Sequence, residues 1–142
     1  MTKELISLNV KGNTKNEVII SLVELLMSTG KIKDKEKVIQ AVLEREQKMS
    51  TGMQNGIAIP HCKTDAVEEL IACFAVNKEG IDFESLDGKP SSIFIMTISP
   101  LNRTGPHIQF LAEISKLLND AERRQKILEA GSADDLYKII IG

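Results

Sequence analysis

Apolar residues recur every three or four positions in residues 14–30, which predicts an amphipathic helix. Thr14 and Glu17 form the capping-box pattern that begins a helix, and Gly30 is a residue type that commonly follows a helix end. The positions expected on its buried face are Val18, Leu22, Leu25 and Leu26. The sequence therefore marks both ends of this helix.

A second helix is predicted to begin near Asp34. Its apolar positions repeat with the same period and are expected to face the interior: Val38, Ile39, Val42 and Leu43. Residues 48–56 are polar and contain two glycines, so a loop should follow this helix.

Residues 70–76 and 92–99 are apolar runs bounded by turn signals. Periodicity alone also fits short buried helices, but the length and β-branched content of both runs favour strands. Strands that are apolar on both faces usually lie in the middle of a sheet covered by helices. Residues 5–10 are expected to form a further strand.

Three more helices are predicted in the last third of the chain, over residues 105–120, 121–131 and 132–141. Pro106 suits the first turn of the first of them. With a strand expected over residues 56–60, the order of elements is β-α-α-β-β-β-α-α-α. We therefore expect an α/β fold, a single-domain sandwich over residues 1–142 with a mixed central β-sheet flanked by helices on both faces.

The composition fits one cytoplasmic domain. The chain has 142 residues, of which 42% are hydrophobic, enough for a substantial core. Lys and Arg number 18 against 20 Asp and Glu, so the net charge of −2 argues against nucleic acid as the main partner. No apolar run is long enough to cross a bilayer, and the first residues lack the layout of a signal peptide. Cys62 and Cys73 form no CxxC pair, and structural disulfides are not expected.

Residues 56–60 lead into His61, one of two histidines in the chain. Pro60 fixes its own φ and pushes Ile59 into an extended conformation, so a strand is expected that ends at the histidine. The imidazole would then stand at a strand end on a stiff backbone. The plain alternative is a histidine at a strand–loop junction with no function.

The other histidine, His107, follows Pro106 directly and falls in the first turn of a predicted helix. The helix dipole there disfavours imidazolium, and backbone N–H groups without partners attract anions. A neutral imidazole in this position could donate a hydrogen bond to a phosphate. The alternative is an ordinary surface histidine.

Arg45 continues the apolar stripe of the second helix, three residues after Val42, and Glu46 lies at the other edge of the same arc. A guanidinium directed partly inward needs a carboxylate partner or an anionic ligand. The alternative, common among arginines, is a side chain that extends to solvent from the helix end or pairs with a nearby carboxylate.

Several common sites are missing from the sequence. There is neither a G-x-x-x-x-G-K-[ST] phosphate loop nor a G-x-G-x-x-G turn, so nucleotide binding is not expected. The histidines and cysteines lack a familiar zinc-ligand spacing. A Cys–His hydrolase would need Cys62 and His61 to face each other, whereas neighbours on a strand point apart.

Residues 43–67, LEREQKMSTGMQNGIAIPHCKTDAV, resemble the phosphorylation-site signature of the enzyme IIA domain of the bacterial phosphoenolpyruvate-dependent sugar phosphotransferase system, fructose/mannitol type. The matching positions are Arg45, Thr51, Gly56, Ala58, Pro60 and His61. Residues 92–118 resemble the family's segment around its second active-site histidine, and residues 83–90 resemble the turn before it. Cys62 replaces the glycine often found after the first histidine. The likeness runs from near residue 5 to the C-terminus.

The resemblance implies that His61 accepts a phosphoryl group from phospho-HPr and passes it to a IIB domain. It implies His107 as the supporting histidine and Arg45 as the cation that stabilises the phosphoryl group. Which ring nitrogen of His61 is phosphorylated stays open. No cofactor, metal or ATP is implied, and a membrane is involved only through a IIC partner. Neutral imidazole suits such a relay because it both takes and releases phosphate readily.

Two classes of function fit this resemblance. One is a transport component that relays phosphate toward an imported sugar, which we favour. The other is a regulatory protein of the nitrogen-related branch, which has the same signature and controls other proteins by its phosphorylation state. A purely structural domain of the same fold is disfavoured by the presence of both histidines and Arg45.

Overall fold

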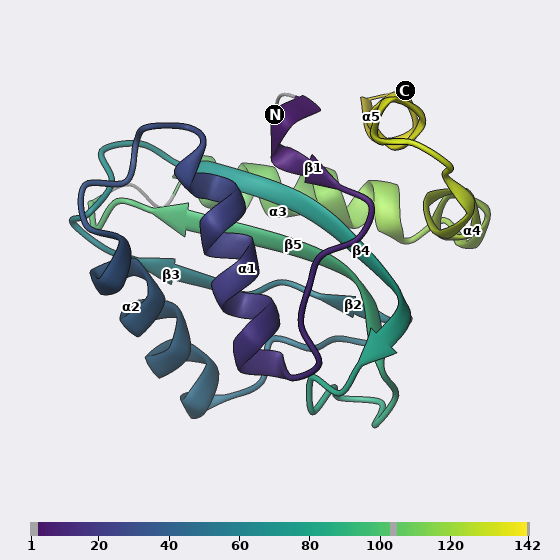
Figure 1. Ribbon diagram of the computed structural model, residues 1–142, viewed down its shortest axis with the longest axis horizontal. Coiled ribbons are helices and arrows are strands. Elements are labelled where there is room, and N and C mark those ends of the chain that lie inside the picture. The colour runs from purple at the N-terminus through teal and green to yellow at the C-terminus, as the bar shows by residue number, and fades with distance from the viewer. Residues whose placement is uncertain (1–2, 103–104, 142) are drawn as a thin grey trace.

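The computed structural model describes residues 3–102 and 105–141 (Figure 1). Within these residues, five strands form one sheet: β1 (Ile6–Ser7), β2 (Ile57–Ala58), β3 (His61–Lys63), β4 (Ile71–Ile81) and β5 (Ser91–Ser99). The long strands β4 and β5 occupy the centre, with β1 beside β4 and with β2 and β3 beside β5. The two apolar runs thus lie in the middle of the sheet, as predicted.

The sheet is mixed. Strands β4 and β5 pair antiparallel, whereas the three short strands run parallel to their neighbours. The register places His61 opposite Thr97 and Cys62 opposite Ile98. Because successive side chains of a strand point to opposite faces, His61 and Thr97 share one face of the sheet, and Cys62 and Ile98 share the other.

Helices α1 (Lys15–Met27) and α2 (Lys35–Lys48) cover the face that carries Ile98 (Figure 1). Both begin where predicted, and the side chains of Thr14 and Asp34 cap them by accepting a backbone N–H three residues on, each at 3.2 Å. The core of this layer contains side chains from the helices and the sheet: Val18, Leu22, Leu26, Val38, Val42, Phe94, Met96 and Ile98. Each such burial stabilises the fold by about 1.5–3 kcal/mol.

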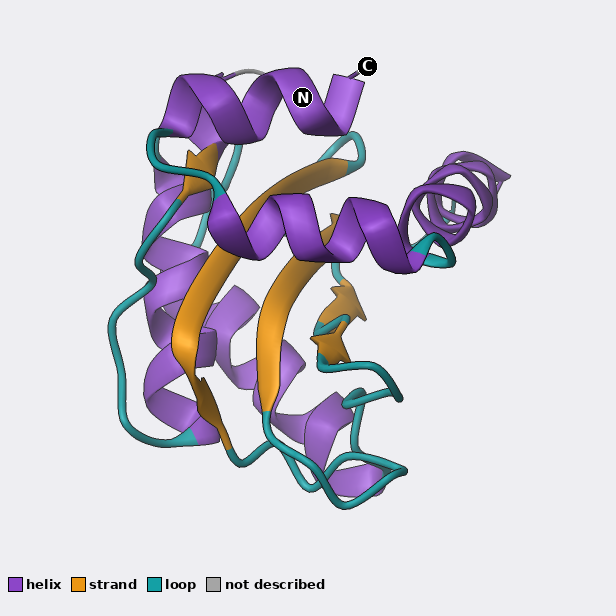
Figure 2. Cartoon of the chain, turned by 90° about the vertical axis from the view of Figure 1, so that its right-hand side faces the viewer, coloured by secondary structure: helices purple, strands orange, loops and turns teal. Residues whose placement is uncertain are grey.

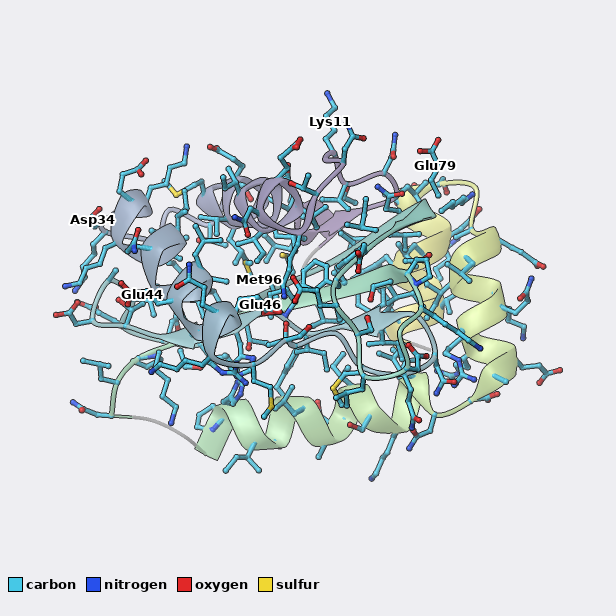
Figure 3. All side chains as sticks on the ribbon, turned by 90° about the horizontal axis from the view of Figure 1, so that it is seen from below. Lys11, Asp34, Glu44, Glu46, Glu79 and Met96 are labelled. Atoms are coloured by element: carbon cyan, nitrogen blue, oxygen red, sulfur yellow. The ribbon has the colours of Figure 1, made fainter. Side chains whose placement is uncertain are left out.

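Helix α3 (Gly105–Leu118) lies on the opposite side of the sheet from α1 and α2 (Figure 3). Helices α4 (Ala121–Glu129) and α5 (Ala133–Ile141) lie across one end of the sheet (Figure 2). A second apolar core joins these three helices to the strands: Ile6, Ile57, Phe74, Ile93, Ile95, Ile114, Ile127 and Leu136. Helices on both faces confirm the predicted α/β class.

None of the helices in the described part of the chain combines the length and the apolar character that a membrane-spanning segment needs.

The strand predicted over residues 56–60 does not end at His61. Pairing in β2 stops at Ala58, because Pro60 has no N–H to contribute, and β3 resumes at His61. The Pro60 carbonyl still accepts the Thr97 N–H at 3.1 Å, which keeps this segment in register with β5. His61 is therefore the first residue of a strand, and the backbone on both sides of it is held to the sheet.

Residues 5–10 form less strand than predicted. Only Ile6–Ser7 pair with β4, after a short 3-10 helix at Lys3–Leu5. The Val10 N–H still donates to the Val76 carbonyl at 3.0 Å, so the segment follows the sheet edge without a continuous ladder.

Candidate active site

His61 stands at the start of β3 with a half-buried side chain. Its Nδ1 lies 2.9 Å from the Ile59 carbonyl oxygen. A carbonyl oxygen only accepts hydrogen bonds, so this contact requires the proton on Nδ1. In the neutral ring the lone pair is then on Nε2. The carbonyl of Ile59, the residue before Pro60, thus selects the tautomer in which Nε2 is available as a nucleophile.

Cys62 points away from His61, as expected for neighbours on a strand. The residue is 5% exposed and packs in the core beneath α1 and α2. Burial raises the pKa of its thiol to about 12, so little thiolate exists at neutral pH. Cys62 and His61 therefore do not form a nucleophile pair of the hydrolase type.

The fold brings His107 to His61. His107 lies in the first turn of α3, and its ring centroid is 5.5 Å from that of His61, with the ring planes inclined by 36°. The Nδ1 of His107 is 3.3 Å from the Oγ1 of Thr97, the β5 residue opposite His61. Two histidines from distant parts of the chain therefore share one site on the face of the sheet that α3 covers.

His107 is neutral at physiological pH. Burial lowers its pKa below the usual 6.5, and the electrostatic effect of the neighbouring His61 and Lys63 lowers it further. A neutral imidazole has one N–H donor and one acceptor nitrogen. The ring can therefore donate a single hydrogen bond to an anion at a helix N-terminus, where the helix dipole also favours negative charge.

Arg45 lies in the last turn of α2, the helix that packs against β3. Its side chain is half-buried, and its Nη1 donates to the Met49 carbonyl at 2.8 Å. Among the described residues, no hydrogen bond joins Arg45 to either histidine. The structure thus places the guanidinium at the helix end, near the strand that carries His61 but outside the histidine pair.

Glu46, not Arg45, is the buried charge at this end of α2. It is 5% exposed, and its carboxylate accepts the Thr51 N–H and the Thr51 hydroxyl, each at 2.7 Å. Lys15 of α1 adds an ion pair at 3.2 Å. Figure 3 labels Glu46 near the middle of the view, next to the label of Met96. This Glu46 cluster (Glu46, Thr51 and Lys15) ties α2 to α1 and to the loop before β2.

Sequence reasoning missed the roles of both Glu46 and Thr97. The apolar pattern of α2 marks Glu46 only as the edge of an arc and does not reveal its partner, Thr51, five residues later. Thr97 sits within an apolar run, and a polar residue there was the one available signal. Its partner is set by the register of β3 and β5.

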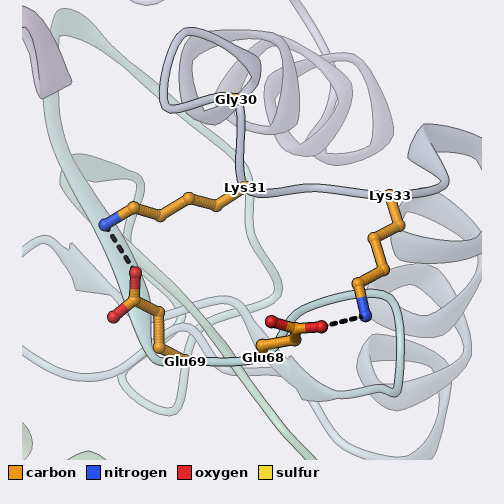
Figure 4. Close-up of a pocket in the computed structure, with 5 residues that line it drawn as sticks. All are labelled: Gly30, Lys31, Lys33, Glu68 and Glu69. Atoms are coloured by element: carbon orange, nitrogen blue, oxygen red, sulfur yellow. Dashed lines mark hydrogen bonds and ion pairs between the residues drawn. The ribbon is translucent and has the colours of Figure 1, made fainter.

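A surface depression lies at the turn between α1 and α2, lined by Gly30, Lys31, Lys33, Glu68 and Glu69 (Figure 4). Lys31 pairs with Glu69 at 2.6 Å and Lys33 with Glu68 at 2.7 Å. The two positive and two negative charges match each other, so the depression offers no surplus charge to an ionic ligand. The histidine pair is the stronger candidate for chemistry.

Comparison with known proteins decides the family. The family model described as "Phosphoenolpyruvate-dependent sugar phosphotransferase system, EIIA 2" matches residues 1–142. The chain belongs to this EIIA family. The predicted family is confirmed, and the histidine pair described above lies in an EIIA fold of the fructose/mannitol type.

Relatives of this EIIA chain include fructose-specific components of the phosphotransferase system and nitrogen regulatory proteins. It is 38% identical to the fructose-specific EIIA component of Haloferax volcanii, over 96% of this chain and 89% of that protein. It is 39% identical to the fructose-specific EIIABC component of Bacillus subtilis, over 99% of this chain but only 22% of that protein's length. It is 30% identical to a nitrogen regulatory protein of Pseudomonas aeruginosa, over 94% of this chain and 86% of that protein.

Solved EIIA structures share the fold. Nitrogen regulatory protein IIA-Ntr from Neisseria meningitidis has a TM-score of 0.89 at 25% identity, over 98% of this chain and 94% of that one. The mannitol enzyme IIA from Escherichia coli, in a complex with phosphorylated mannitol enzyme IIB, has a TM-score of 0.85 at 25% identity, over 100% and 97% of the two chains. Both likenesses confirm the mixed α/β architecture.

Proposed function

We propose that this EIIA protein is a phosphoryl carrier, in which His61 accepts a phosphoryl group from phospho-HPr and passes it to a IIB component for sugar import. The observation that carries the proposal is the bond between His61 Nδ1 and the Ile59 carbonyl, which leaves Nε2 unprotonated. A nucleophile needs a free lone pair, and membership of a sugar phosphotransferase family supports phosphorus as its target.

In the proposed reaction, the Nε2 lone pair of His61 attacks the phosphorus of the donor. The new N–P bond forms as the bond between phosphorus and the donor's leaving group breaks, and that group departs with the electron pair. The onward step is the same displacement, with His61 as the leaving group. The ring gains positive character when Nε2 is bonded to phosphorus, and the Nδ1–H bond to Ile59 stabilises that charge. In this proposal the two displacement steps need neither ATP nor a metal ion.

His107 and Arg45 are proposed to stabilise the negative charge on the phosphoryl oxygens. His107 lies beside His61 and can donate one hydrogen bond without adding a charge. Arg45 would exchange the Met49 carbonyl for phosphoryl oxygens, an exchange that a long, half-buried side chain at a helix end allows. One cation and one neutral donor stabilise the phosphoryl group without trapping it.

Exposed apolar side chains beside the site support exchange with protein partners. Met49, Leu101 and Ile108 are 66%, 57% and 64% exposed. Met49 supplies the carbonyl that holds Arg45, and Ile108 follows His107 in α3. Interfaces of transient complexes combine apolar residues with a polar or charged site. The same surface would meet phospho-HPr and then a IIB component, the kind of partner seen with the related Escherichia coli EIIA.

A regulatory role is the second candidate. It is favoured by the likeness to nitrogen regulatory proteins, in sequence and in fold. The phosphoryl chemistry would be the same, but the phosphorylation state would control binding to another protein. Transport remains the main proposal, because identity to the fructose-specific component of Haloferax volcanii is higher.

Reconstituted phosphoryl transfer tests this proposal. The protein is incubated with phosphoenolpyruvate, enzyme I and HPr, and a IIB component is then added. We expect label on the protein only when HPr is present, followed by loss of that label to the IIB component. Label that needs ATP instead of phosphoenolpyruvate would overturn the proposal. Labelling without onward transfer to any IIB component would favour the regulatory role.

A further inference from the structure

Thr97 connects the two histidines through two different bonds. Its backbone N–H donates to the Pro60 carbonyl at 3.1 Å, directly before His61. Its Oγ1 lies 3.3 Å from Nδ1 of His107. Thr97 is 0% exposed, so water does not compete for either bond. One residue of the central strand therefore holds both the segment that carries His61 and the ring of His107.

The side chains of β5 on the face covered by α3 change from apolar to polar at Thr97. On the face covered by α3, the buried side chains of Ile93 and Ile95 are followed by Thr97. A valine would continue the apolar face with almost the same shape. It would also leave Nδ1 of His107 facing a methyl group, without a hydrogen-bond partner. The hydroxyl at this position is therefore explained by the imidazole beside it.

We propose that Thr97 is a positioning residue that selects the tautomer of His107, donating its hydroxyl proton to Nδ1 so that the ring presents Nε2–H to the site. The inference rests on the proposed function, because the tautomer matters for transfer only if an anion is bound beside the ring. Thr97 itself does not touch the phosphoryl group in this proposal.

The number of available protons indicates that the Thr97 hydroxyl is the donor and Nδ1 of His107 the acceptor in the bond between them. The Thr97 hydroxyl has one hydrogen, and the described part of the chain gives this hydroxyl one hydrogen-bond partner, Nδ1 of His107. If Nδ1 donated instead, the buried hydroxyl hydrogen would have no acceptor. Buried donors without partners are rarer than acceptors with a spare lone pair, so donation by Thr97 is favoured.

The two tautomers of His107 present opposite groups to the site. A protonated Nε2 donates to a phosphoryl oxygen, whereas an unprotonated Nε2 presents a lone pair that repels it. Loss of one preorganised donor slows comparable reactions by about 100-fold. Without Thr97 both tautomers become available and only part of the molecules keep the donor, so we expect Thr97→Val to slow transfer by less than the about 100-fold of complete donor loss.

Ring-nitrogen NMR of the unphosphorylated protein tests the tautomer directly, and it needs no phosphoryl donor. We expect wild type to show a neutral His107 with its proton on Nε2. Thr97→Ser keeps the hydroxyl and should keep this tautomer, while Thr97→Val should shift the population toward the proton on Nδ1. Transfer rates to a IIB component are measured on the same three proteins and should follow the same order.

Ser99→Ala is the matched control. Ser99 lies two residues further along the same strand face and is 1% exposed, and its Oγ has no hydrogen-bond partner among the described residues. Removing this hydroxyl should change neither the His107 tautomer nor the transfer rate. A loss of activity in both Thr97→Val and Ser99→Ala would point to general disturbance of β5 and overturn the specific role.

The proposal is overturned if wild-type His107 carries its proton on Nδ1, a result that requires no variant to fold. It is also overturned if Thr97→Val keeps the wild-type tautomer and transfers at the wild-type rate. Failure of the proposed function would show as an absence of phosphoryl transfer in every protein, including wild type. The tautomer measurement would still stand in that case, so the two failures are distinguishable.

Discussion

The Glu46 cluster leads to a stability prediction that can be worked out from its contacts. Glu46→Ala removes a carboxylate whose side chain is 3% exposed. The Thr51 N–H then loses its acceptor in a residue that is 4% exposed, and the Lys15 ammonium, on a side chain that is 15% exposed, loses its counter-charge. Breaking a buried ion pair from one side costs about 3–5 kcal/mol. Leaving the Thr51 N–H without an acceptor would by itself cost about 1–3 kcal/mol. Both costs arise from removal of the same carboxylate, so they are not additive. The expected loss is about 3–5 kcal/mol in total.

Urea unfolding at neutral pH measures this loss, and Glu68→Ala is the matched control. Glu68 also pairs with a lysine, Lys33, at 2.7 Å, but these side chains are 79% and 56% exposed. An exposed pair of this kind contributes about 0–1 kcal/mol. If Glu46→Ala is no more destabilising than Glu68→Ala, the cluster does not secure the end of α2 and the reasoning is refuted.

A double-mutant cycle separates the ion pair from the Thr51 bonds. Lys15→Met should destabilise the wild type, because it leaves the buried Glu46 carboxylate without its counter-charge. In the Glu46→Ala background the same change should cost much less, since the carboxylate is already gone. A coupling free energy near zero would show that Lys15 and Glu46 are neighbours without an energetic link.

The remaining predictions concern the site. Arg45→Lys keeps the positive charge but loses the bidentate guanidinium, so phosphoryl transfer should slow while the urea midpoint of unfolding is unchanged. Normal transfer rates in both Arg45→Lys and Arg45→Ala would show that Arg45 has no role beyond its hydrogen bond to the Met49 carbonyl. His107→Gln retains a donor and should slow onward transfer less than His107→Ala, and equal wild-type rates in both would remove the helper role. Folding lowers the pKa of His107, so below about pH 6.5 the unfolded chain binds more protons than the folded chain. The free energy of unfolding should therefore decrease as the pH falls below about 6.5. His107→Gln should lack this part of the pH dependence in urea unfolding, and an unchanged dependence would contradict the assigned shift.

Local signals in the sequence predict most of the fold. The caps at Thr14 and Asp34 begin α1 and α2 where expected, because capping depends on residues only three positions apart. The apolar runs became β4 and β5, since length and composition favour strands in a covered sheet. The restart of pairing at His61 was not predictable in this way. It depends on a bond from Thr97 to the Pro60 carbonyl, and no local pattern encodes that register.

The site was predictable in its residues but not in its contacts. Pro60 and the first turn of α3 singled out His61 and His107, yet their ring separation of 5.5 Å follows from how α3 packs on the sheet. Periodicity predicted that Arg45 points partly inward; the structure leaves Arg45 half-buried and buries Glu46, at the other edge of the arc, more deeply. The two positions are one residue apart, which is about 100° around a helix. An apolar stripe is itself about 100° wide, so it does not predict which of the two side chains is buried.

The central claim is that Nε2 of His61 carries the phosphoryl group. The most direct measurement is NMR of the ring nitrogens and phosphorus after phosphorylation with phosphoenolpyruvate, enzyme I and HPr. The account predicts a single phosphohistidine, at His61, with phosphorus bonded to Nε2 and the proton on Nδ1 still facing the Ile59 carbonyl. Phosphorus on Nδ1 of His61, phosphorus on His107, or a phosphohistidine signal that persists in His61→Ala would contradict it.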